Sequence, residues 1–397
     1  MKTIYLDNNA TTRVADEAKK EMEPFFCEFY GNPSSMHTFG GGVQKHIDNA
    51  RERLASLLGA ADPAEIIFTS CGSESDNAAI WAALRTCPEK KHVVTSRVEH
   101  PAVLNLCHFL ESQGYKVTYL GVDGEGRLDM DHLREAVNEN TAIVTLMWAN
   151  NDTGVVFPVE DAARIVKSRG SVFHTDAVQS AGKIPINLKN SAIDMLSVSG
   201  HKLHAPKGIG ALYVRKGTRF IPFLMGGHQE RGRRAGTENV PYIVGFGKAA
   251  ELAGQHIEKE NTKVKTLRDR LELGLMKAIP NCRRNGHPDE RLPNTANISF
   301  EFVEGEAILL LLSEKGIAAS SGSACTSGAL EPSHVLRAMG VPYTFAHGSV
   351  RFSLSRYTTA EEIDTLLREM PGIIEKLRKI SPFSEGKPLF GQECEIH

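Results

Sequence analysis

Residues 194–202 read DMLSVSGHK, and this stretch decides the fold because it joins a buried strand to a lysine through a tight turn. The apolar run is short and bounded by polar residues, as in strands buried inside a parallel sheet. The turn ends the strand and brings Lys202 to its carboxyl end. Ligands of open α/β sheets bind beyond the carboxyl ends of the strands, so we expect Lys202 to face a binding cleft.

Similar short runs, rich in β-branched residues, alternate with helical patterns between about residues 43 and 260. They predict an α/β protein with a mostly parallel sheet, in which strands cover residues 66–68, 92–94, 142–147, 171–173 and 194–198. Polar residues that follow these strands should gather at one edge of the sheet: Thr69, Ser70, His100, Asn150, Asp176 and Ser199.

The chain has 397 residues and is longer than a domain with a single hydrophobic core usually is. A charged helical stretch after about residue 255 predicts a helix that leaves the large domain. We therefore expect a large domain over residues 15–260, and a smaller α+β domain made of residues 1–14 and 261–397. In the smaller domain we expect strands at 297–300 and 349–354, and helices at 304–313 and 360–378.

Composition excludes several classes of function. Hydrophobic residues make up 41% of the chain, and the formal charge of -2 comes without a long basic run, which argues against nucleic-acid binding. No apolar run approaches the length of a membrane span, and the first residues lack a signal-peptide core, so we expect a cytoplasmic protein. Seven cysteines without a CxxC pair argue against a zinc site or a disulfide framework, and no metal is expected.

The lysine itself suggests a chemistry. Burial would lower the pKa of the Lys202 amine and make it a nucleophile toward an aldehyde such as that of pyridoxal phosphate (PLP). Asp176, at a strand end 26 residues earlier, would pair with the pyridine nitrogen of such a cofactor, and Gln179 would hydrogen-bond its ring oxygen. Without the other motifs, Lys202 would be interpreted as an exposed loop lysine, and Asp176 as a helix cap.

A phosphate site is predicted where a small-residue turn opens a helix. Gly72 and Ser73 follow the strand at 66–68, and the free N–H groups of a helix start favour a phosphate, although such turns often serve only as caps. Ser199 and His201 would add donors. The basic loop at 232–237, which ends in Thr237, would reach a phosphate in the neighbouring subunit, or else be an exposed turn.

Two further strand ends carry candidates for cofactor contact. His100 would lie over the cofactor ring and shuttle protons, against the alternative of a structural histidine. Asn150 would donate to the ring oxygen, or else form a turn.

Two residues of the predicted small domain complete the constellation. Cys325 lies in SSGSACTSGA (320–329), where small residues on both sides predict an exposed, mobile loop and therefore a functional thiol. Arg351 could hold a substrate carboxylate through two hydrogen bonds, or else form an interdomain salt bridge.

Taken in order, these motifs closely resemble the group I cysteine desulfurases of the NifS/IscS type, in the fold type I, aspartate aminotransferase-like superfamily of PLP enzymes. The resemblance spans nearly the whole chain and is carried by YLDNNATT (5–12), GNPSS (31–35), SGHK (199–202), GSACTS (322–327) and LEPS (330–333). The chain departs from the family where Ser70-Cys-Gly-Ser73 stands in place of Ser-Gly-Ala-Thr, so that Ser73 would replace the usual threonine.

The resemblance implies a role for each candidate. Lys202 is implied as the PLP lysine, Asp176 as the pyridinium partner, His100 as the stacked ring and Cys325 as the persulfide cysteine. Asn150 and Gln179 are implied to contact the cofactor, and Asn32 and Arg351 to contact the substrate. The implied contacts to the cofactor's phosphate are Gly72, Ser73, Ser199, His201 and the other protomer's Thr237.

The implied activity is conversion of L-cysteine to L-alanine, with the sulfur carried on Cys325 and passed to an iron-sulfur scaffold protein. The resemblance also implies a homodimer, and it is slightly closer to the nitrogen-fixation branch. The alternatives are a selenocysteine lyase or another fold type I PLP aminotransferase, a catalytically idle platform for sulfur acceptors, and a cofactor-free cysteine hydrolase, for which no His/Asn arrangement can be identified.

Overall fold

The computed structural model describes residues 3–321 and 331–382. Its centre is a seven-stranded sheet with the order β2-β8-β7-β6-β5-β3-β4, in which only β8 runs antiparallel to its neighbours. The predicted α/β class with a mostly parallel mixed sheet is therefore confirmed. The strands are β2 (Ile66–Thr69), β3 (His92–Ser96), β4 (Lys116–Leu120), β5 (Thr141–Met147), β6 (Val172–Asp176), β7 (Met195–Ser199) and β8 (Gly210–Val214).

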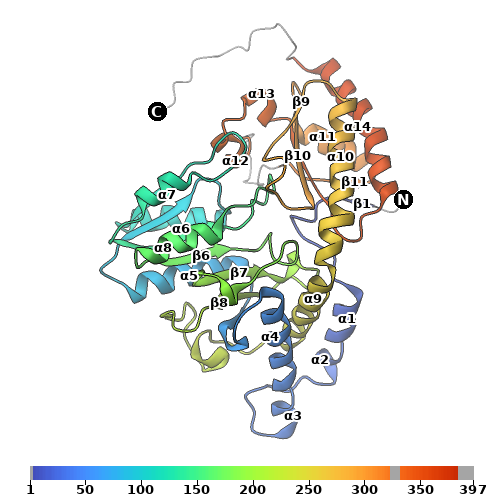
Figure 1. Cartoon of the computed structure of the whole chain (residues 1–397). Coiled ribbons are helices and arrows are strands. Elements are labelled where there is room, and N and C mark those ends of the chain that lie inside the picture. Colours follow the sequence, from blue (N-terminus) through green and yellow to red (C-terminus); the bar gives the residue numbers. More distant parts are fainter. Residues whose placement is uncertain (1–2, 322–330, 383–397) are drawn as a thin grey trace.

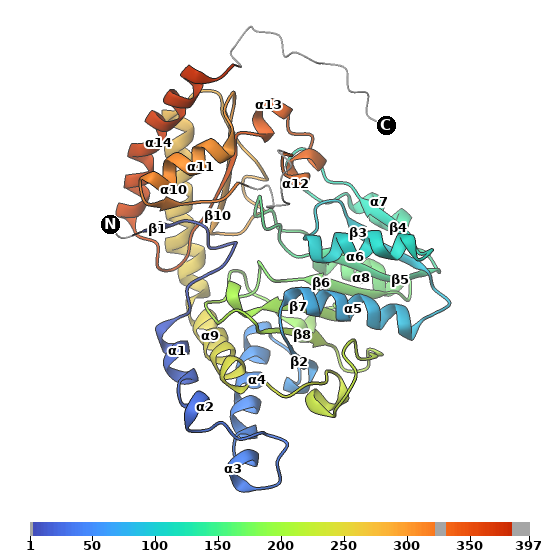
Figure 2. The ribbon, with the colours of Figure 1, turned by 180° about the vertical axis from the view of Figure 1, so that it is seen from behind.

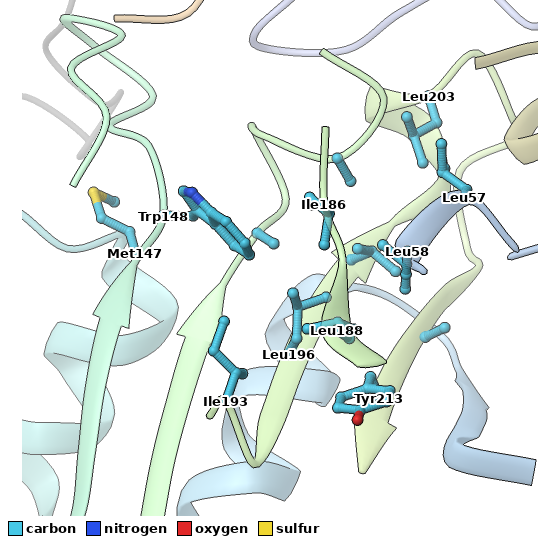
Figure 3. Close-up of a cluster of buried hydrophobic side chains, with 14 of the residues drawn as sticks. Leu57, Leu58, Met147, Trp148, Ile186, Leu188, Ile193, Leu196, Leu203 and Tyr213 are labelled. Atoms are coloured by element: carbon cyan, nitrogen blue, oxygen red, sulfur yellow. The ribbon is translucent and has the colours of Figure 1, made fainter. Parts of the chain in front are cut away.

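Helices cover both faces of this sheet, because the side chains that its strands direct to each face are mostly apolar. One face packs against α4, α7, α8 and α9, and the other against α5 and α6. Figure 3 shows side chains of α4, of β7 and of the segment 184–193 packed together on the first face. The helices are α4 (Gln44–Leu58), α5 (Gly72–Thr86), α6 (Pro101–Ser112), α7 (Met130–Ala136), α8 (Val159–Ser168) and α9 (Val240–Lys259).

A second core lies beside this three-layer unit. It joins Leu6 to apolar residues between 264 and 377, around the antiparallel sheet β12-β10-β9 and the parallel pair β1-β11. Both views show β1 within this unit (Figures 1 and 2). The elements are β1 (Ile4–Tyr5), β9 (Cys282–Arg284), β10 (Thr295–Phe300), β11 (Ile317–Ala318), β12 (Ser349–Ser353), α10 (Lys265–Ala278), α11 (Gly305–Glu314) and α14 (Ala360–Ile380). The short helices α12 (His334–Ala338) and α13 (Tyr343–Ala346) pack their buried side chains into the core of the three-layer unit instead.

One nearly continuous helical rod runs along both units. It consists of α9, a π-helical turn over Glu260–Val264, and α10, seen in yellow and gold in Figure 1. The predicted boundary near residue 260 coincides with this turn, and the separate cores support the predicted division into two domains, which we retain as a proposal.

The remaining elements are short. The chain between the first strand and α4 forms α1 (Asp16–Met22), α2 (Pro24–Cys27) and α3 (Thr38–Gly41), and single turns of 3-10 helix occur at Pro63–Glu65, Leu188–Asn190, Gly200–Lys202 and Gln229–Gly232. Among the described residues, no helix is long and apolar enough to cross a lipid bilayer.

The loop that carries Thr237 is fixed to the edge of the central sheet by a buried ion pair. Arg51 donates two hydrogen bonds to Glu230, at 2.7 and 2.8 Å, and both side chains are at most 5% exposed. Glu230 also accepts from the N–H of Phe68 in β2. Two parallel N–H···O bonds give the pair a defined geometry, so the loop is held in one position relative to the strand.

Candidate active site

A cavity of about 420 Å³ lies at the carboxyl ends of β2, β6 and β7, where the sequence predicts a cleft. Residues of β12 and α12, together with Ser320 and Ser321, complete its lining. Nine of the thirteen candidate residues lie within the described part of the chain and line this cavity: Gly72, Ser73, His100, Asp176, Gln179, Ser199, His201, Lys202 and Arg351.

Lys202 sits in the single 3-10 turn that follows β7 and extends its amine into the cavity. Its Nζ donates to the carbonyl oxygens of Asn9 at 2.5 Å and Ala10 at 2.7 Å. Burial lowers the pKa of Lys202 to about 7, and repulsion from Lys183 and Arg351 acts in the same direction. A substantial fraction of neutral amine is therefore present near neutral pH, as a nucleophile or base requires.

Asp176 is the last residue of β6, the strand next to β7. It is 7% exposed, and one carboxylate oxygen accepts from the N–H of Val178 at 2.8 Å. Burial raises the pKa of Asp176, whereas the Val178 hydrogen bond and the charges of His100 and Lys202 oppose that rise. The site thus places a carboxylate one strand away from the lysine amine.

Two buried carboxyl groups lie near Asp176 and were not predicted from the sequence. The pKa of Asp76 is raised by burial and then by repulsion from Asp176, and burial raises the pKa of Glu99 to about 8. Asp76 lines the cavity. Removal from water disfavours the charged form of both groups, and repulsion from Asp176 adds to this effect.

His100 begins α6 and caps it. Its Nδ1 accepts from the N–H of Ala102 at 3.1 Å, so the neutral ring carries its proton on Nε2. Removal from water, and the charge of Lys202, lower the pKa of His100, while Asp176 opposes that shift. The ring therefore offers a neutral N–H donor at the cavity wall.

A second histidine on this wall, His201, has a fixed partner. Nδ1 of His201 lies 3.2 Å from the hydroxyl of Thr11, and burial lowers the pKa of His201 to about 4. The ring is therefore neutral in the physiological range, and it can act in the site through a hydrogen bond but not through a positive charge.

The turn before α5 fits a phosphate. A side chain at Gly72 would place its Cβ 2.9 Å from Val178 and 3.5 Å from Ser199, so only glycine lets the backbone lie this close to the sheet. The Ser199 hydroxyl is buried and has no hydrogen-bond partner among the described residues. This hydroxyl donor lies beside the free N–H groups at the start of a 15-residue helix. An anionic ligand would accept hydrogen bonds from both.

Arg351 forms a salt bridge within the predicted small domain, not the interdomain salt bridge considered for it, and its contact with a substrate stays a prediction. From β12 it donates to the carbonyl of Asn151 at 3.0 Å and to the carboxylate of Asp7 at 2.9 Å, so it forms a salt bridge. It also lines the cavity, and its buried Nε has no partner among the described residues. A carboxylate ligand could therefore still engage this guanidinium.

Three candidates are not brought to the cavity wall. Asn150 is fully buried, and its side chain donates to the carbonyl of Val98 and accepts from Asp152 and Thr153, so it forms the turn that was its alternative reading. Asn32 and Thr237 are exposed, and neither lines the cavity of its own subunit. Their predicted contacts stay predictions. Cys325 lies outside the described residues.

Sequence reasoning also missed several residues that shape the cavity. His334 begins α12 and places Nε2 3.0 Å from the carbonyl of Glu99, and the neighbouring Ser333 donates to Asp152 at 2.6 Å. Asn9 supplies a carbonyl to Lys202. The only sequence signal for Asn9 was its position in the YLDNNATT motif, and no local pattern assigns it a role.

Known proteins resemble this chain over nearly its whole length. The family model described as aminotransferase class-V matches residues 4–366. The chain is 63% identical to a cysteine desulfurase of Trichormus azollae over 96% of both chains. It is 61% identical to the cysteine desulfurase NifS of Azotobacter vinelandii, over 97% of this chain and 96% of that protein.

Solved structures give the same picture. A NifS-like protein superposes with a TM-score of 0.89 and 41% identity, covering 94% of this chain and all of the other. A structure described as SspA in complex with cysteine superposes with a TM-score of 0.78 and 38% identity, over 89% of this chain and 99% of that one.

Proposed function

The chain belongs to the aminotransferase class-V family, as a cysteine desulfurase of the NifS type, and from this premise we propose that it holds PLP on Lys202 and passes the sulfur of L-cysteine to Cys325. One observation carries the proposal: a lysine amine with its pKa lowered to about 7 shares a cavity with a buried carboxylate on the adjacent strand. The family is PLP-dependent, and the fold type I class is confirmed.

The residues present fit each part of PLP. The orphaned Ser199 hydroxyl and the start of α5 at Gly72 suit the phosphate, and Asp176 suits a protonated ring nitrogen. His100 would lie against the ring and Gln179 would donate to its oxygen. When bound, PLP supplies an aldehyde that bonds an amine and a ring that accepts an electron pair.

Side chains of the protein carry out proton transfer, substrate binding and sulfur transfer. The neutral Lys202 amine accepts the Cα proton of the substrate, Arg351 holds the substrate carboxylate, and Asp176 retains the proton on the ring nitrogen. The Cys325 thiolate attacks the substrate sulfur, so that an S–S bond forms as the substrate C–S bond breaks. The sum is L-cysteine plus Cys325 thiol giving L-alanine plus Cys325 persulfide, which balances in atoms and electrons.

Product analysis tests this function against its rivals. Purified enzyme loaded with PLP and supplied with L-cysteine and a thiol reductant is expected to release alanine and sulfide in equal amounts. A keto acid product would indicate a transaminase, and turnover of selenocysteine without turnover of cysteine would indicate a selenocysteine lyase. Absence of any product from well-folded, PLP-loaded protein would contradict the proposal.

Asp176→Asn is expected to lower turnover by about 10²-fold or more, because an amide cannot keep the ring nitrogen protonated and the ring then accepts electrons poorly. The cofactor should stay bound to Lys202, so the visible absorption persists while alanine release falls. Asp131→Asn, a change at an exposed carboxylate on α7, is the control and should keep normal turnover. Equal turnover in both variants would remove Asp176 from this role.

We also propose that the active enzyme is a homodimer in which each subunit supplies Asn32 and Thr237 to the site of its partner. Both residues are exposed and lie away from the cavity of their own subunit. The segment that carries Asn32 is also unusually apolar at its surface, with five large side chains at least 48% exposed: Phe26, Phe29, Tyr30, Met36 and Phe39. Such a patch favours burial against another protein surface.

Tyr30→Arg tests the dimer because it places a charge in the middle of this patch, where the tyrosine is 69% exposed. We expect the variant to sediment as a monomer and to bind PLP at least about tenfold more weakly. Leu310→Arg, at an equally exposed leucine on α11, should do neither. A Tyr30→Arg dimer with unchanged PLP affinity would contradict the proposed interface.

We also propose where the sulfur goes after it reaches Cys325. The similarity to NifS of Azotobacter vinelandii supports delivery from Cys325 to an iron-sulfur scaffold protein, and a role in nitrogen fixation. A cytoplasmic location stays a prediction.

A further inference from the structure

A second lysine lies buried directly behind Lys202. Lys183 is 8% exposed, in the turn region that follows β6. Lys183 and Lys202 both line a small internal cavity of about 20 Å³, together with Glu260 and Arg356. A lysine is rarely buried in a protein unless it is paired, so its partners need to be identified.

Within residues 3–321 and 331–382, no carboxylate lies within ion-pairing distance of the Lys183 amine. Its one hydrogen-bond acceptor there is Oε1 of Gln179, at 3.1 Å. The charged and titratable groups that face it are Glu260 on the π-helical turn, Arg351 and Arg356 on and after β12, and Lys202 and His204 after β7. Burial lowers the pKa of Lys183 to about 8, against the attraction of Glu260.

This burial is costly for the fold. A buried ammonium group loses its hydration, and a neutral amide replaces only part of it. The positive charge of Lys183 also repels that of Lys202. A pair of purely structural lysines would gain nothing from this repulsion. Perturbed, poorly compensated charges of this kind are concentrated at functional sites.

The hydrogen bond from Lys183 fixes the orientation of the Gln179 amide. A lysine amine in its charged form has donors only, so it selects the oxygen end of the amide and directs the Nε2 end the other way. Nε2 donates to the carbonyl of Asn9 at 3.0 Å, and Gln179 lines the large cavity. Lys183 and the Asn9 carbonyl therefore select the same orientation of the amide, each from one end.

The same contacts lead to Lys202. The carbonyl of Asn9 accepts from Gln179 and also, at 2.5 Å, from the Lys202 amine. A short chain of contacts therefore connects the three residues: Lys183 to Gln179, Gln179 to Asn9, and Lys202 to the same Asn9 oxygen.

We propose that Lys183 is a positioning residue for the active site: its charge holds the Lys202 nitrogen in the unprotonated form, and its hydrogen bond turns the N–H end of Gln179 toward the cofactor. The proposal rests on the proposed function, because it assumes that Lys202 carries PLP. Lys183 itself touches neither substrate nor cofactor.

The test is a pH titration of the visible absorption of the PLP-loaded enzyme, which follows the proton on the Lys202 nitrogen. In Lys183→Met and Lys183→Gln, the midpoint is expected to rise by about half a pH unit or more, because a nearby positive charge has been removed. Lys183→Arg keeps the charge and should titrate close to the wild-type midpoint. Thermal unfolding measured on the same samples should show the neutral variants at least as stable as the wild type.

The outcomes separate this proposal from the proposed function. Wild-type protein that never acquires a lysine-linked cofactor band would refute the function itself. With a normal wild-type band, an unchanged midpoint in both neutral variants would overturn the role of Lys183. Failure of both neutral variants to fold, with Lys183→Arg folding normally, would make it a structural cation and would also overturn the proposal.

Discussion

Lys202→Ala is expected to reduce alanine release from L-cysteine by at least about 10³-fold, because it removes both the anchor of the cofactor and the base that accepts the substrate proton. The variant should still fold, since within the described part of the chain the Lys202 amine donates hydrogen bonds only to two backbone carbonyls, of Asn9 and Ala10. The absorption band of lysine-linked PLP should be lost, and reduction with borohydride should leave no cofactor on the protein.

Lys216→Ala is the matched control, because Lys216 is an exposed lysine that follows β8 on the same sheet. It should keep the band and the turnover. Turnover by Lys202→Ala within tenfold of the wild type would exclude the amine from the reaction. Retention of a borohydride-stable adduct by that variant would place the cofactor on another lysine.

Cys325→Ala is expected to separate cofactor binding from sulfur transfer. The variant should bind PLP and develop the normal absorption band, because no predicted cofactor contact is changed. Steady turnover of L-cysteine should fall by at least about 10²-fold, since the thiolate that accepts the sulfur is missing. The measurement is alanine release over many turnovers, with the spectrum recorded on the same sample.

Cys87→Ala is the control for the loss of a thiol, because Cys87 is a free cysteine at the end of α5, outside both the cavity and the proposed interface. It should keep full turnover. Sustained multiple turnover by Cys325→Ala would remove Cys325 from the mechanism while leaving the cofactor assignment intact, so the two largest predictions fail independently.

Much of the site could be predicted because parallel strands deliver their carboxyl ends to one edge of a sheet. Asp176 and Lys202 follow adjacent strands, and His100 and Gly72 follow two others, so a local strand pattern was enough to bring them to one cavity. Local patterns also predicted two strands and two helices of the second unit, β10, β12, α11 and α14, whose observed bounds differ from the predicted ones by at most two residues.

What escaped prediction depends on contacts between segments far apart in the sequence. Asn9 meets Lys202 across almost 200 positions, and His334 meets Glu99 across more than 200, so no local period contains either pair. The antiparallel direction of β8 depends on strand pairing and was equally hidden.

Asn150 illustrates a different limit of sequence reasoning. Its position after a strand suggested a cofactor contact, but its side chain satisfies the backbone of its own turn at Asp152 and Thr153. A short amide side chain can make either kind of contact, and the residue type alone does not decide between them.

The central claim is that Lys202 carries the cofactor, and peptide mapping tests it most directly. Wild-type enzyme loaded with PLP is reduced with borohydride, digested and analysed by mass spectrometry. We expect one reduced phosphopyridoxyl group per subunit, on the peptide that contains Lys202. A well-folded protein that gives no adduct, or an adduct on any other lysine such as Lys183, would contradict it.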